Sequence, residues 1–96
     1  MRKLRVGLAQ INTKVGDLDG NAQKIADFIA ESRDLGIDIV TFPELAITGY
    51  PPEDMILRDN FIDKNIAILN EIKSISTGIT AIVGFVNRNN NNIYNA

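Results

Sequence analysis

One acidic residue, Glu44, follows the end of a predicted strand, a position where α/β enzymes often carry catalytic side chains. Glu44 follows the apolar, β-branched segment 37–42, and Pro43 ends the ladder of that predicted strand. In open α/β sheets, ligands bind outside the carboxyl ends of the strands. The apolar neighbours Phe42, Pro43 and Leu45 would partly desolvate the carboxylate, which favours the role of a general base. A solvated acid that caps a turn fits the same position, so position alone leaves both interpretations open.

A stiff loop follows Glu44 and supplies an aromatic side chain. It runs over residues 49–54, Gly-Tyr-Pro-Pro-Glu-Asp, where Gly49 frees the backbone and two prolines restrict it. Tyr50 offers a ring and a hydroxyl near the carboxylate, a combination that suits a pocket for a small substrate. A structural turn with Tyr50 packed on the sheet is equally consistent with the local sequence. Glu53 and Asp54 suit a helix N-terminus, and their spacing matches no metal-ligand loop, so we expect no metal site.

Composition excludes several kinds of chemistry. The 96 residues contain no Cys and no His, which removes disulfides, thiolate metal sites, cysteine nucleophiles and Ser-His-Asp triads. The sequence contains no Gly-rich dinucleotide loop and no Walker sequence. The net charge of −2 argues against a nucleic-acid partner. No apolar run reaches the ~18–20 residues of a membrane helix, so we expect no membrane partner and a cytoplasmic location.

The pattern of apolar residues predicts the elements that position these side chains. Apolar segments predict strands over residues 4–11, 37–42 and 80–87. Apolar residues at helical spacing predict a helix over about 21–35 and a second from residue 60 to the Thr77-Gly78 break. The asparagine tract 89–92 predicts a hairpin turn, with a returning strand beginning at residue 93.

Polar residues and glycines predict where these helices begin and end. Asp19 or Asn21 would cap the first helix, and Gly36 would end it. Asn60 would cap the second helix. The connection over 43–59 is long enough to contain one or two helical turns, with Pro52 at the first helical position.

Alternation of strands and helices indicates an α/β sheet with right-handed crossovers. The strands are apolar at consecutive positions, which is typical of a sheet buried on both faces. The two predicted helices can cover only one face. Because the chain also stops just after the hairpin reversal, we expect an N-terminal piece of a longer protein, with part of its apolar surface exposed.

Two segments resemble a known family. The opening LRVGLAQINTKVGDLDGN and the later FPELAITGYPPEDMILRDNF resemble the carbon–nitrogen hydrolase (nitrilase) superfamily. The segment PPEDMILRDNF is typical of a smaller group within that superfamily: it resembles the amidase domain at the N-terminus of the glutamine-dependent NAD⁺ synthetase family. The closing IVGFVNRNNNNIYNA fits the hairpin that follows, so the resemblance covers essentially the whole chain.

The resemblance implies a fold, a reaction and roles for two residues. The implied fold is an αββα sandwich, with residues 1–96 as the first βαβαβ portion and the start of a further strand. Glu44 matches the general base of a Glu-Lys-Cys catalytic group, and Tyr50 matches a residue that lines the glutamine pocket. The family's Lys and Cys have no counterparts in this sequence, so we expect residues 1–96 alone to be inactive.

The same resemblance implies substrates and partners. Glutamine would be the small-molecule substrate, and the remainder of the polypeptide would be the immediate partner, in an expected homo-oligomer. The ammonia released would serve ATP-dependent synthesis of NAD⁺ from nicotinic acid adenine dinucleotide. ATP and Mg²⁺ would belong to a separate synthetase domain, and we expect no cofactor in this piece.

Two other functions remain open at this point. The chain could belong to a stand-alone nitrilase-type amidohydrolase, which would lack an SGGxDS pyrophosphatase motif further along. It could also be a non-catalytic α/β module of flavodoxin-like type, with a ligand bound on helix N-terminal amides. The absence of a Gly-rich first turn argues against the module.

Overall fold

The computed structural model describes residues 2–96. In chain order the elements are β1 (Val6–Leu8), α1 (Leu18–Asp34), β2 (Ile39–Thr41), the 3₁₀ helix η1 (Glu53–Leu57), α2 (Asp59–Ile75), β3 (Thr80–Ile82), β4 (Val86–Asn89) and β5 (Asn92–Asn95). No helix in this range is both long and apolar enough to cross a lipid bilayer.

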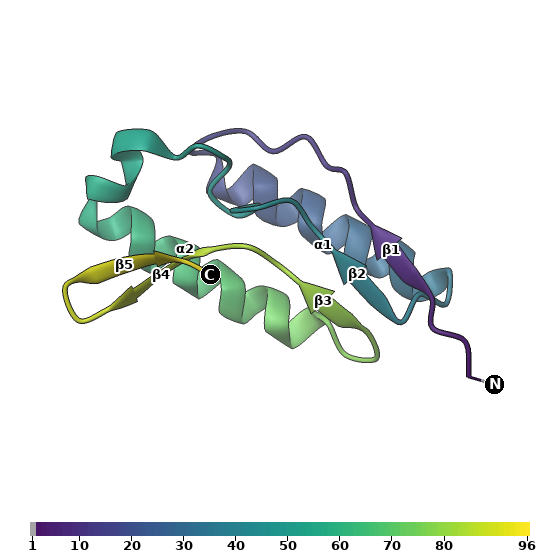
Figure 1. Cartoon of the computed structure of the whole chain (residues 1–96). Helices are drawn as coiled ribbons and strands as arrows, with labels where there is room; N and C mark the ends of the chain where they lie inside the picture. Colours follow the sequence, from purple (N-terminus) through teal and green to yellow (C-terminus); the bar gives the residue numbers. More distant parts are fainter. Residues whose placement is uncertain (1) are drawn as a thin grey trace.

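Strands β1, β2 and β3 form a parallel sheet in that order, and α1 and α2 are the two crossovers (Figure 1). Val40 at the centre of β2 pairs with Gly7 on one side and Ala81 on the other. Parallel neighbours need crossover connections, so the alternating pattern of the sequence leads directly to this topology. The predicted α/β sheet is confirmed.

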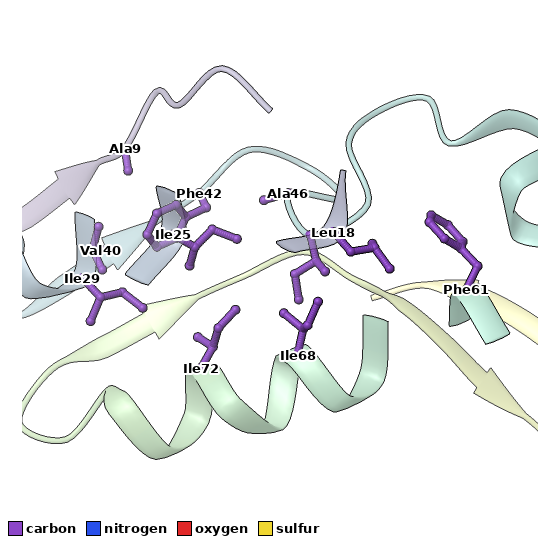
Figure 2. Packing of buried hydrophobic residues seen from close by; sticks show 11 residues of the cluster. Ala9, Leu18, Ile25, Ile29, Val40, Phe42, Ala46, Phe61, Ile68 and Ile72 are labelled. Carbon is purple, nitrogen blue, oxygen red and sulfur yellow. The ribbon is translucent and has the colours of Figure 1, made fainter. Parts of the chain in front are cut away.

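The core lies between the sheet and the two helices, which both cover the same face. Ile25 and Ile29 of α1, Ile68 and Ile72 of α2 and Val40 of β2 belong to one buried hydrophobic cluster (Figure 2). Side chains alternate across a strand, so the side chains of Val40 and Ala81 point to this face together, and Gly7 lies beside them in register. Their neighbours in sequence point to the other face.

That other face of the sheet is uncovered within residues 2–96. Val6 and Leu8 of β1 and Ile82 of β3 are exposed there. The consecutive apolar positions predict burial on both faces, but the described chain supplies helices for only one. The apolar side chains on the second face are therefore left in contact with solvent.

Both predicted helix starts are wrong, whereas the predicted end of the first helix at Gly36 is confirmed. The first helix begins at Leu18, because Asp17 caps it: its Oδ1 accepts a hydrogen bond from the amide of Gly20 at 3.1 Å. Asn60 lies inside the first turn of α2, which starts at Asp59. Gly36 follows the end of α1 with φ of +75°, the left-handed conformation that the sequence predicts there.

The predicted strand 80–87 is two strands in the structure. β3 ends at Ile82, and β4 begins at Val86 and pairs with β5 in an antiparallel hairpin. Asn90 in the turn has a φ of +59°, so the asparagine tract makes the predicted hairpin turn. The hairpin lies beyond the carboxyl end of β3 and alongside α2 (Figure 1).

Candidate functional site

Glu44 and Tyr50 lie at the two ends of one buried turn. After β2 the chain turns at residues 44–48, and Leu45, Ala46, Ile47 and Thr48 are all buried. Glu44 is exposed, and the side chain of Tyr50 is 60% exposed. The buried turn is therefore a fixed base from which the two predicted site residues project toward solvent.

Hydrogen bonds within the turn hold its shape. The amide of Gly49 donates to the carbonyl of Leu45 at 2.9 Å, and the Thr48 hydroxyl donates to the same carbonyl at 3.3 Å. Leu45 has a φ of +47°, a left-handed conformation that costs a residue with a side chain free energy of order 1–2 kcal/mol. Strained backbone of this kind clusters at functional sites, and here it lies next to Glu44.

Asn21 ties the turn to the loop before α1. Its buried amide pairs with the backbone of Lys14, accepting from the Lys14 amide and donating to the Lys14 carbonyl, each at 2.8 Å. The same Nδ2 donates to the carbonyl of Ile47 at 2.9 Å. The sequence predicts Asn21 as a helix cap, and this is wrong: Asn21 lies inside α1 and joins two loops.

The hairpin closes on the turn from the other side. Gly84 lies so close to it that a Cβ there would sit 2.5 Å from the amide nitrogen of Leu45. Asn65 of α2 anchors Val86, the first residue of β4. The buried side-chain amide of Asn65 accepts from the Val86 amide at 3.1 Å and donates to the Val86 carbonyl at 2.5 Å. The strand break at 83–85 is thus the place where the chain passes over the Glu44 turn.

One side chain from the hairpin contacts Glu44 itself. The side-chain amide of Asn95, on β5, donates a hydrogen bond to Oε1 of Glu44. Sequence reasoning does not single out Asn95, which looks like one more asparagine after the 89–92 tract. The available signal is strand register, since a hairpin turn at residues 90–91 places Asn95 opposite Val86.

The apolar neighbours of Glu44 pack away from it. Phe42 and Leu45 are buried in two core clusters, and Glu44 is exposed within the described chain. A depression of about 340 Å³ opens at the carboxyl ends of β1 and β2, lined by Leu8, Ala9, Gln10, Thr41, Phe42 and Pro43. Glu44 directly follows the last of these lining residues.

This arrangement suits proton transfer next to a small ligand. A carboxylate on a rigid turn can accept a proton in a fixed direction, and the neighbouring depression offers a partly apolar surface. Among the side chains that the structure describes, no cluster of three or more Asp and Glu is arranged to hold a metal ion. Glu53 and Asp54 lie instead in the first turn of η1.

Comparison with protein families and curated proteins identifies relatives along the whole chain. The model of the carbon–nitrogen hydrolase family matches residues 5–96. The glutamine-dependent NAD(+) synthetase of Thermotoga maritima is 39% identical over 98 residues, which cover 100% of this chain and 17% of that protein. The chain thus spans about one sixth of the length of the curated relatives it matches.

Solved structures agree with the family match. A glutamine-dependent NAD(+) synthetase from Cytophaga hutchinsonii superposes with a TM-score of 0.91 at 35% identity, covering 96% of this chain and 16% of that one. An amidase from Nesterenkonia sp. superposes with a TM-score of 0.75 at 23% identity, over 88% of this chain and 32% of that one. The sheet and its helices therefore form part of a nitrilase-type fold.

Proposed function

This chain belongs to the carbon–nitrogen hydrolase family, and we propose that it is the N-terminal portion of a glutamine amidase domain. In this proposal the domain supplies ammonia for ATP-dependent synthesis of NAD⁺ from nicotinic acid adenine dinucleotide. The observation that carries the proposal is the similarity to glutamine-dependent NAD(+) synthetases along the whole chain.

In this mechanism Glu44 is the general base. It takes the proton from a cysteine thiol, the thiolate attacks the glutamine carboxamide, and a lysine stabilises the tetrahedral oxyanion. The proton then returns to the leaving nitrogen, ammonia departs, and a thioester remains. Glu44 next takes a proton from water, and the water oxygen attacks the thioester carbonyl. The C–S bond then breaks, glutamate is released, and the proton returns from Glu44 to the cysteine sulfur.

The chain supplies only part of this machinery. With no Cys in its 96 residues, the nucleophile must come from the remainder of the polypeptide. Tyr50, exposed at the far end of the same turn, would line the pocket for glutamine. ATP and Mg²⁺ would bind to the synthetase part, because residues 1–96 carry no phosphate-binding loop.

The test compares two nitrogen sources on one preparation of the full-length protein that contains this chain. We expect Glu44→Gln to lose NAD⁺ formation from glutamine by ~10²–10⁴-fold, the range for removal of a general base. Formation driven by added ammonium should be unchanged, since ammonium enters after the amidase step. Glu31→Gln, which alters an exposed acid on α1, is the matched control and should change neither rate.

The outcomes separate the competing interpretations. An equal fall in both rates would make Glu44 a structural residue or one that couples the two domains. Two unchanged rates would show that Glu44 is not the base. A full-length protein that hydrolyses glutamine but makes no NAD⁺ from either nitrogen source would be a stand-alone amidohydrolase.

A further inference from the structure

The contact between Asn95 and Glu44 joins two residues 51 positions apart in the sequence. We propose that Asn95 is the positioning residue for Glu44: its side-chain amide fixes the direction of the carboxylate by donating to Oε1. This inference rests on the proposed function, because it assigns Glu44 the role of base. It adds Asn95 to Glu44 and Tyr50 as a residue of this chain in the amidase site.

Strand register points the Asn95 side chain at the Glu44 turn. Val86 and Asn95 are directly opposite each other in the antiparallel pair β4–β5, so their side chains lie on the same face of the hairpin. Val86 packs with Leu45, the residue next to Glu44. A slip of one residue would put Tyr94 in place of Asn95 and remove the Asn95 carboxamide from that face.

Backbone hydrogen bonds attach the hairpin to the Glu44 turn and extend its ladder past Asn95. The Ile47 amide, within the turn, donates to the carbonyl of Gly84 at 3.3 Å. Beyond Asn95, Ala96 and Phe85 exchange two backbone hydrogen bonds of 2.9 and 3.0 Å, which continue the pairing of the hairpin strands. Asn65 holds Val86 to α2 in the manner described above. The donor and the acceptor are therefore both attached to rigid backbone.

A fixed donor matters because Glu44 is exposed. A free glutamate side chain samples several rotamers, and ordering it costs conformational entropy. The hydrogen bond from Asn95 orders the glutamate side chain before substrate binds. Because it occupies Oε1, Oε2 is left to receive the proton. A carboxamide is also neutral at every working pH, so it orients the carboxylate without supplying a competing proton.

The experiment uses the full-length protein and the two nitrogen sources described above. We expect Asn95→Ala to lower kcat with glutamine by roughly 10- to 100-fold, the range for one hydrogen bond to a charged group, with little change in KM. Asn95→Asp, which has the same shape but no donor and a second negative charge, should lose more than Asn95→Ala. Asn91→Ala, in the turn of the same hairpin, is the matched control and should behave as the unaltered protein.

A double variant separates positioning from other roles. Added to Glu44→Gln, the change Asn95→Ala should cause no further loss, because the group that Asn95 orients is already gone. A further loss of the full single-variant size would overturn the proposal, as would equal falls in the glutamine and ammonium rates. If Asn95→Ala and Asn95→Asp both retain full glutamine activity while Glu44→Gln is inactive, Asn95 has no positioning role and the proposed function stands. An active Glu44→Gln would overturn both.

Discussion

At the scale of single residues, Gly84 leaves no room for a side chain, since a Cβ there would lie 2.5 Å from the backbone nitrogen of Leu45. It needs no unusual φ, yet the space for a side chain is already filled by the backbone of Glu44 and Leu45. A side chain at this position must therefore displace the turn that carries the proposed base. Glycine is required here by close approach of two backbone segments rather than by its conformational freedom.

We predict that Gly84→Ala impairs the amidase step. The added methyl group should cost ~1–3 kcal/mol of folding free energy, as overpacking does. Displacing Glu44 by about 1 Å should lower glutamine-driven NAD⁺ formation by ~100-fold, with the ammonium-driven rate retained. Steady-state rates with both nitrogen sources check this prediction.

Gly78→Ala is the contrasting control for Gly84→Ala. Gly78 has a φ of +83°, but no heavy atom lies within 4 Å of the place that a methyl group would take, so its substitution strains the backbone without pushing on a neighbour. We expect a cost of ~1 kcal/mol in folding free energy and an unchanged glutamine-driven rate. A wild-type glutamine rate in Gly84→Ala would contradict the view that this contact sets the place of Glu44.

The candidate site was only partly predictable from its residue types. Glu44 could be found because a strand ending at Pro43 must place the next residue at the carboxyl edge of a sheet. Asn95 could not be found from its type, since five of the seven residues 89–95 are asparagine and local sequence gives them the same appearance. Its role depends on pairing across the hairpin and on the passage of Gly84 over the turn, both of which are tertiary.

At the scale of elements, two buried asparagine side chains form hydrogen bonds to backbone groups in the way that a neighbouring strand would. Asn21 pairs with both backbone groups of Lys14, and Asn65 pairs with both backbone groups of Val86. Each amide supplies one donor and one acceptor, as a neighbouring strand would. The helices α1 and α2 thus hold the loop before α1 and the hairpin in place beside the Glu44 turn.

We predict that Asn65→Ala loosens the hairpin locally. The change leaves the amide and carbonyl of Val86 without partners in a buried position, and each unmet group costs ~1–3 kcal/mol. Amide hydrogen exchange over residues 84–96 of the full-length protein should become about 100-fold faster. Asn70→Ala, at an exposed position of the same helix, is the control and should leave the exchange rates of this segment unchanged.

Equal exchange rates in the two variants would show that the hairpin is held by other contacts.

The contacts of these two asparagines explain why the sequence predicts the helices better than the connections between them. Periodicity finds α1 and α2 because it depends on near neighbours, whereas Asn21 binds a carbonyl 26 residues away and Asn65 binds one 21 residues away. An asparagine near a helix start is usually a cap, and that local rule misassigned Asn21.

At the scale of the whole molecule, the uncovered face of the sheet is the main feature. Val6, Leu8 and Ile82 lie exposed on one side of a three-stranded sheet whose other side carries the core. Exposed apolar side chains gathered on one face of a sheet are typical of an interface. The family's αββα sandwich implies that a second sheet covers this face in the longer protein, and we expect the remainder of the domain to supply it.

We predict that isolated residues 1–96 self-associate through this face. Two copies that stack their uncovered sheets would bury the same apolar side chains that the longer protein would cover. Replacing one of the most exposed of them, in Leu8→Lys, removes ~1.5–3 kcal/mol of burial free energy, so the dissociation constant should rise by roughly 10- to 100-fold. Sedimentation velocity over a concentration series measures this change.

The chain offers a closely matched control in Leu57. Leu8 is 73% exposed and Leu57 is 77% exposed, but Leu57 lies at the end of η1 rather than on the sheet. If the sheet face drives association, Leu57→Lys leaves the dissociation constant unchanged and Leu8→Lys raises it. Equal effects of the two variants would mean that association follows exposed apolar area in general. A strictly monomeric isolated chain with a sharp cooperative melt would contradict the prediction, because the uncovered face would then be stable in water.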